Sequence, residues 1–190
     1  MLPAKINVSD KIVNKKRRIF FALWPDENTR SKLIKVYNLS ELSQLPGKKY
    51  QPDNLHLTLC FLGNVSDDQA DCALKAAQLI SFKSFEINLD CFGFFKKPKV
   101  LWMGSSGYSL ALNSLHENLT AALSDCGFVL DDKAFTPHVA LMRKLPRFDI
   151  DVDILAPTVA WRVDRFALVE SVSFEGGVVY RPIKFFACQF

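Results

Sequence analysis

The chain has 190 residues, of which 49% are hydrophobic and 23% are charged, so it can bury a full core as a single domain. Its longest apolar runs, such as residues 19–24, are far shorter than a bilayer span, which excludes a membrane-spanning protein. The formal net charge of +4 is mild and permits a polyanionic ligand without requiring one.

The first half of the chain is predicted to alternate strands and helices behind an N-terminal extension. Residues 1–16 are charged and weakly patterned, which predicts a flexible tail before a single domain over residues 17–190. The elements expected next are a strand at 18–24, a helix with Pro25 in its first turn, a long loop at 39–52, a strand at 55–62 and a helix from an N-cap at Ser66 to about residue 80.

The second half is richer in strands. Strands are expected at 85–92 and 100–103 beside a basic turn at 96–99, followed by a helix at 108–126 that carries His116 on its surface and stops at Gly127. Further strands are expected at 135–145, 160–163, 165–174 and 178–187, with Gly176 and Gly177 turning the last hairpin. This order predicts an α+β fold with largely antiparallel sheets.

The five cysteines are an odd number, and no two of them form a C-x-x-C pair. Such scattered spacing favours neither a disulfide framework nor a zinc site. We therefore expect reduced, half-buried thiols in a cytoplasmic protein. The residues concerned are Cys60, Cys72, Cys91, Cys126 and Cys188.

A first short motif lies in the strand predicted at 55–62. Side chains alternate across a strand, so His56, Thr58 and Cys60 are expected on one face. A histidine and a hydroxyl are then presented together, opposite the apolar face. The residues expected on that apolar face, in the core, are Leu55, Leu57, Leu59 and Phe61.

A second motif repeats this scheme in the strand predicted at 135–145. His138 and Ala140 share a face, and Pro137 favours an extended Thr136, which places Thr136 on the same face two residues upstream. A single histidine in a strand is most often structural. Two of only three histidines in matching strand frames favour a functional pair, His56 and His138.

The two motifs resemble the paired H-x-[T/S] signatures of the 2H phosphoesterase superfamily, and in particular its RNA 2',3'-cyclic phosphodiesterases, long named 2'-5' RNA ligases. The similarity covers residues 17–186. It rests on the opening strand at 18–23, the full first motif at 52–63, the second motif at 135–143 with its arginine, and Glu170-Ser171.

This resemblance implies a bilobal, pseudo-symmetric α+β fold in which two largely antiparallel sheets line a central cleft with helices outside. It also implies hydrolysis of 2',3'-cyclic phosphates on RNA ends or nucleotides to 2'-phosphates, with no cofactor and no obligate protein partner. Two histidines without a carboxylate in ligand spacing would also make a poor metal site.

The chemistry needs a base that activates water and an acid that protonates the departing ribose oxygen, and imidazoles titrate near neutral pH. By analogy, His56 is the proton donor that serves O3' and His138 is the proton acceptor. Hydroxyl groups and an arginine would bind the phosphate as charge builds on it, and an aromatic ring would stack on a base. The predicted substrate-binding residues are Thr58, Thr136, Arg143 and Phe20.

Ala140 departs from the family pattern, because it stands where the second hydroxyl is expected. Thr136, a backbone amide or a water molecule would then replace that hydroxyl, or the protein would bind nucleotides or RNA without efficient turnover. The residues also leave open 2'-5' RNA ligation, opening of a small cyclic nucleotide or cyclic ADP-ribose phosphate, and catalysis by a Cys60 nucleophile.

Overall fold

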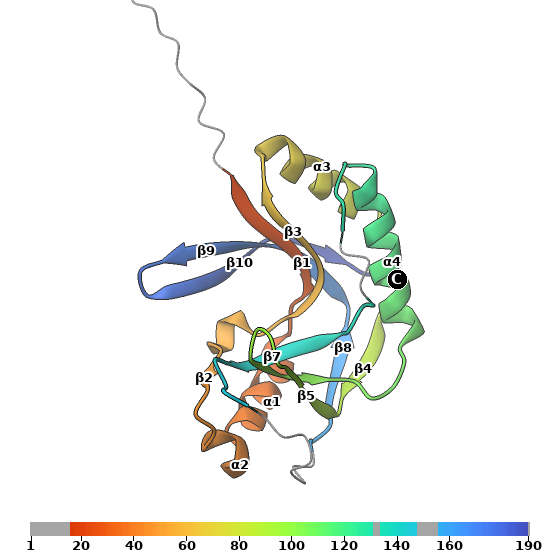
Figure 1. The fold of residues 1–190 in the computed structure, drawn as a ribbon. Helices are drawn as coiled ribbons and strands as arrows, with labels where there is room; N and C mark the ends of the chain where they lie inside the picture. The colour runs from red at the N-terminus through yellow and green to blue at the C-terminus, as the bar shows by residue number, and fades with distance from the viewer. Residues whose placement is uncertain (1–15, 131–133, 148–155, 190) are drawn as a thin grey trace, which may run out of the picture.

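The computed structural model describes residues 16–130, 134–147 and 156–189. In this part of the chain, an antiparallel eight-stranded sheet has the order β10-β9-β1-β3-β7-β6-β5, with β2 on β7, and β4 pairs with β8 in a separate sheet (Figure 1). The strands are β1 (Arg17–Leu23), β2 (Lys48–Lys49), β3 (Leu57–Val65), β4 (Phe85–Leu89), β5 (Cys91–Phe95), β6 (Val100–Gly104), β7 (His138–Arg143), β8 (Val159–Val163), β9 (Arg165–Phe174) and β10 (Gly177–Ala187).

The helices lie outside the sheets, as predicted, and the three that are longer than four residues each begin at a side-chain cap. The Ser66 side chain accepts from the Gln69 amide in a complete capping box, which starts α3 at the predicted residue. Asp26 caps α1, so Pro25 lies just before the cap and not in the first helical turn. The bounds are α1 (Glu27–Tyr37), α2 (Ser40–Ser43), the 3-10 turn η1 (Pro52–Asn54), α3 (Asp67–Gln78) and α4 (Leu110–Ser124).

The large sheet consists of two halves, one built from β1, β3, β9 and β10 and the other from β2, β5, β6 and β7. A single residue pair, Leu57 with Val139, joins the halves through β3 and β7, and both side chains are fully buried. His56 immediately precedes the first of these residues and His138 the second. The join therefore brings the two predicted histidines to the same place in the fold.

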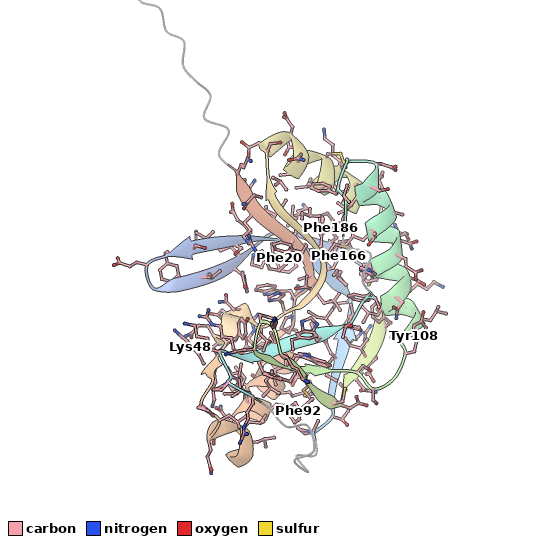
Figure 2. The ribbon with its side chains drawn as sticks, in the orientation of Figure 1. Phe20, Lys48, Phe92, Tyr108, Phe166 and Phe186 are labelled. Atoms are coloured by element: carbon pink, nitrogen blue, oxygen red, sulfur yellow. A yellow bond between two sulfur atoms is a disulfide. The ribbon has the colours of Figure 1, made fainter. Side chains whose placement is uncertain are left out.

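The core fills the space between the sheets and the helices. Phe166 on β9 and Phe186 on β10 stack with their ring centroids 4.9 Å apart. Figure 2 shows both rings on the side of the large sheet that faces α4. Phe20 belongs instead to a smaller cluster on the other side of β1, together with Trp24 and Val169. Burial of these apolar side chains stabilises the scaffold by roughly 25 cal/mol for each Å² of apolar surface removed from water.

Several predicted boundaries are wrong for identifiable reasons. The segment expected as a loop at 39–52 contains α2 and β2, and the strand expected at 85–92 is divided between β4 and β5, which lie in different sheets. In β3, the pairing with β1 skips Leu59 and Leu62, so the strand bulges. The bulges turn Phe61 outward, and it is 50% exposed where a core position was expected.

Two further expectations are corrected by tertiary contacts. Cys72 on α3 and Cys126 after α4 form a disulfide, whereas all five thiols were expected to be reduced. His116 is partly buried, not on the surface, because its ring stacks on Phe135 at 4.0 Å and its Nδ1 donates to the Leu59 carbonyl. The expected tail at residues 1–16 lies almost wholly outside the described residues. No helix among those described is long and apolar enough to cross a membrane.

Candidate active site

His56 immediately precedes β3, and hydrogen bonds at both ring nitrogens fix the orientation of its ring. Its Nδ1 lies 2.7 Å from the Asn54 carbonyl oxygen, which can only accept, so Nδ1 carries the proton. The Nε2 atom is then an acceptor in the neutral ring, and the Thr58 hydroxyl donates to it at 3.1 Å. Phe20 and Tyr180 enclose the ring, each with its centroid 4.9 Å away.

His138 begins β7 and repeats this arrangement. Its Nδ1 lies 2.7 Å from the Thr136 carbonyl oxygen, also two residues upstream, so its Nε2 is likewise the unprotonated nitrogen of the neutral ring. Phe95 lies edge-on to the ring at 4.9 Å, and Trp102 packs at 5.8 Å. Both imidazoles are therefore held in the same tautomer by backbone carbonyls and kept in place by aromatic packing.

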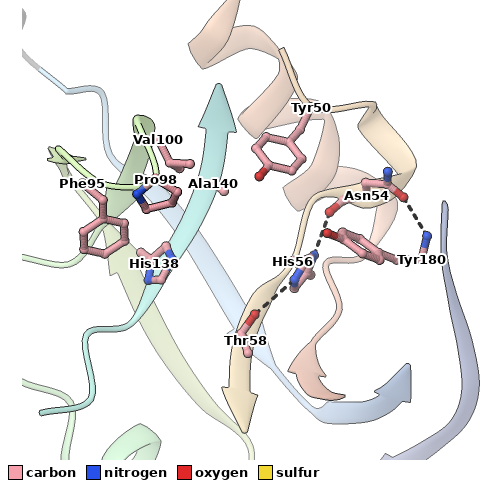
Figure 3. A pocket seen from close by; sticks show the side chains of 10 residues that line it. All are labelled: Tyr50, Asn54, His56, Thr58, Phe95, Pro98, Val100, His138, Ala140 and Tyr180. Carbon is pink, nitrogen blue, oxygen red and sulfur yellow. Dashed lines mark hydrogen bonds between the residues drawn. The ribbon is translucent and has the colours of Figure 1, made fainter. Parts of the chain in front are cut away.

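The two imidazoles line one cavity of about 360 Å³ at the join between the halves of the sheet. Figure 3 shows His56 on one side of this cavity and His138 on the other, with Thr58 below and Tyr50 above. We call it the central cavity. It is lined by Tyr50, Asn54, His56, Thr58, Phe95, Pro98, Val100, His138, Ala140 and Tyr180.

Burial lowers the pKa of both imidazoles, because it disfavours the charged form of the ring. It lowers the pKa of His56 to about 4, opposed by the hydrogen bond to Asn54 and assisted by repulsion from His138. Burial also lowers the pKa of His138, opposed by the hydrogen bond to Thr136. Both rings are thus neutral at pH 7 before a ligand binds, and each Nε2 carries a lone pair, which in His56 accepts from the Thr58 hydroxyl.

Of the other four predicted site residues, the structure places one in the central cavity and three beside it. Thr58 lines the central cavity, whereas the Thr136 hydroxyl donates to the Ala134 carbonyl at 3.4 Å and lines an adjoining cavity. Phe20 is 3% exposed and packs on His56. Arg143 ends β7, lies over the Tyr50 ring at 5.8 Å from its centroid, and lines a neighbouring basic cavity with Lys48.

The site also contains residues that the sequence patterns did not reveal. The buried Asn54 side chain donates to the Val178 carbonyl at 2.8 Å and accepts from the Tyr180 amide at 2.9 Å, which ties η1 to β10. Tyr50 lines the central cavity from the segment after β2. The one signal in the sequence is the closeness of Asn54 to His56 in the chain.

Cys60 does not share the orientation of His56, because the bulge in β3 turns its thiol toward α4. The sulfur lies 3.5 Å from the Thr120 hydroxyl and 3.8 Å from His116 Nδ1. Burial raises the pKa of the Cys60 thiol to about 11, so the thiol is protonated at neutral pH. This environment is that of a structural cysteine and not of a nucleophile.

Two imidazoles that face one cavity, in an antiparallel α+β scaffold, are typical of two-histidine phosphoesterases. Within the described residues, no three histidine, cysteine or carboxylate side chains are grouped to hold a metal ion. A model of the 2'-5' RNA ligase superfamily matches residues 30–173, and the chain belongs to this superfamily.

Similar proteins include the RNA 2',3'-cyclic phosphodiesterase of Thermotoga maritima, 32% identical over 73% of this chain and 76% of that protein. The enzyme of the same name from Escherichia coli is 29% identical over 88% and 94% of the two chains. Among solved structures, E. coli LigT complexed with 3'-AMP has a TM-score of 0.81 at 28% identity, over 92% of this chain and 99% of that one. The TT0787 protein of Thermus thermophilus has a TM-score of 0.72 at 26% identity, over 90% and 97%.

Proposed function

We propose that the chain hydrolyses 2',3'-cyclic phosphates on RNA ends or nucleotides to 2'-phosphates, without a metal or other cofactor. The observation that carries this proposal is the pair of imidazoles in one cavity, each with Nδ1 bound to a carbonyl oxygen, which leaves Nε2 as the nitrogen for proton transfer. Relatives named RNA 2',3'-cyclic phosphodiesterase, similar over most of the chain, support the choice of substrate.

In the proposed reaction, His138 Nε2 takes a proton from water as the water oxygen attacks phosphorus. The bond between phosphorus and O3' breaks, and O3' receives the proton from His56 Nε2, which leaves the phosphate on O2'. His56 is neutral at pH 7 before substrate binds, so it must gain its proton as the substrate binds. The negative charge of the phosphodiester favours the imidazolium form and raises the pKa of His56 toward neutrality.

In this proposal, the other residues bind the phosphate or the RNA backbone, or they orient the two imidazoles. Once His56 is protonated, its Nε2 no longer accepts from Thr58, so the Thr58 hydroxyl is free to donate to a non-bridging oxygen. Arg143 attracts the RNA backbone at the rim, together with Lys48. Thr136 acts through its carbonyl, which orients His138, and Phe20 holds the His56 ring in place.

A short RNA with a 2',3'-cyclic end tests this proposal with three proteins. The wild type is expected to open the ring in the presence of EDTA, while His56→Ala and His138→Ala each lose at least a thousandfold in kcat, as expected when an acid or base is removed from such a pair. Near-normal turnover by either variant would contradict the assignment.

The superfamily name raises ligation as a second candidate activity, the same chemistry in reverse. Incubation of cyclic-ended and 5'-hydroxyl RNAs distinguishes the two, because a ligase forms a longer 2'-5'-linked product and a hydrolase does not. Binding without either product would indicate a non-catalytic module.

We also propose a cytoplasmic location, because the expected substrate is RNA. The Cys72–Cys126 disulfide is unusual for such a location, since disulfides are more common outside the cytoplasm.

A further inference from the structure

The two halves of the central cavity differ in one chemical group. His56 is followed two residues later by Thr58, whereas His138 is followed by Ala140, which offers only a methyl group. Because β3 and β7 are antiparallel and pair at Leu57 and Val139, Ala140 lies opposite His56 and Thr58 lies opposite His138. The β7 half of the cavity therefore lacks the motif hydroxyl that the β3 half has in Thr58.

A backbone hydrogen bond fixes Tyr50 beside Ala140. The chain leaves β2 at Lys49, and the Tyr50 amide donates to the Leu141 carbonyl at 2.9 Å, one residue beyond Ala140. Neighbouring strands lie about 4.8 Å apart, which a phenol side chain spans easily. Figure 3 shows the Tyr50 ring entering the central cavity with its hydroxyl on the side of Ala140.

The Tyr50 hydroxyl is chemically ready to donate. Among the residues that the structure describes, it has no hydrogen-bond partner, so its proton is available to a ligand. Burial raises the pKa of the Tyr50 phenol, opposed by Arg143, so the group stays protonated through the neutral range. A phenol in such a position is a known type of donor to developing negative charge.

We propose that Tyr50 is a further catalytic residue, whose hydroxyl donates to a non-bridging oxygen of the cyclic phosphate on the side where Ala140 cannot. This proposal rests on the proposed function and names the group that completes its site. Thr58 and Tyr50 then bind the two non-bridging oxygens from opposite halves of the sheet, and the loss of the second motif hydroxyl is compensated from a neighbouring segment.

Two other hydroxyls are less suited to this role. The Thr136 hydroxyl is directed at the Ala134 carbonyl and lines the adjoining cavity. Tyr180 lies on β10 in the half that already has Thr58, and its ring packs edge-on against His56. Tyr50 and Tyr180 both line the central cavity, but of these three hydroxyl residues Tyr50 is the one bound to β7 next to Ala140.

The test combines two substitutions in a cycle with adenosine 2',3'-cyclic phosphate as substrate. Tyr50→Phe is expected to lower kcat by about tenfold to a hundredfold with a smaller change in KM, as for loss of one oxyanion donor. Ala140→Thr is expected to restore most of that loss in the Tyr50→Phe background and to change the wild type much less. Tyr108→Phe is the matched control, since Tyr108 is 76% exposed near the start of α4 (Figure 2).

A second measurement separates donation from a structural role. With the two phosphorothioate isomers of the substrate, sulfur replaces one or the other non-bridging oxygen, and the wild type should prefer one isomer. Tyr50→Phe should change that preference, because it removes the donor to one of the two oxygens. Wild-type kcat in Tyr50→Phe, or lower kcat with an unchanged isomer preference, would overturn the role of Tyr50 while leaving the proposed function intact. Absence of turnover in the wild type would overturn both.

Discussion

Asn54 links the position of His56 to the β9–β10 hairpin, and its removal should be felt in both stability and rate. Its side chain donates to the Val178 carbonyl at 2.8 Å and accepts from the Tyr180 amide at 2.9 Å. Its own carbonyl accepts from His56 Nδ1 at 2.7 Å. Asn54→Ala keeps that carbonyl but deletes both side-chain bonds that hold it in place.

The expected magnitude follows from burial. Asn54 is 7% exposed, and leaving a buried donor or acceptor unpaired costs about 1–3 kcal/mol per group. Val178 and Tyr180 are only partly buried, so water satisfies part of the loss. We expect the free energy of unfolding to fall by about 2 kcal/mol. A loosened His56 should lower kcat by roughly tenfold, since small misplacements of reacting groups are costly.

Urea unfolding and steady-state kinetics with adenosine 2',3'-cyclic phosphate measure the two effects, with Asn54→Asp as the matched variant. Aspartate keeps the acceptor for the Tyr180 amide, loses the donor to Val178 and adds a negative charge near His56. That charge should raise the pKa of His56 and shift the kcat/KM profile upward in pH, which alanine should not do. Wild-type stability and kcat in Asn54→Ala would refute the reasoning.

Three further results are expected. Burial lowers the pKa of His56 to about 4 and also lowers the pKa of His138, so kcat/KM, which reports the free enzyme, should peak below pH 6.5. The optimum of kcat should lie at higher pH, because the bound substrate anion raises the pKa of His56. A kcat/KM optimum above pH 7 would contradict this. Replacing Cys72 and Cys126 by serine should lower the free energy of unfolding in urea by about 2–4 kcal/mol with kcat unchanged, and equal stability would count against the disulfide. Arg143→Gln should raise KM for RNA and flatten its salt dependence; identical slopes for both proteins would exclude a phosphate contact.

The parts of the fold set by local sequence were predictable. Ser66 was expected to cap a helix and does so, and the strand expected at 165–174 is β9. The placement of His56 and His138 in one cavity was also predictable, because both sit in matching frames beside apolar residues that must be buried. In each case, the deciding information lies within a few neighbouring residues.

The features that escaped prediction depend on partners far away in the chain. The bulge that exposes Phe61 arises from pairing with β1, and the disulfide requires α3 and α4 to pack side by side. Asn54 bonds with Val178 and Tyr180, which are 124 and 126 residues away. No residue pattern near these positions marks their distant partners, whereas His56 and His138 carry matching motifs.

The most direct test of the central claim is to digest a short RNA with a terminal 2',3'-cyclic phosphate and locate the phosphate in the product by 31P NMR. The two-histidine account predicts a metal-independent reaction that yields the 2'-phosphate alone, and loss of that product in His56→Ala and His138→Ala. A 3'-phosphate product, or a substrate left intact by the wild type, would contradict it.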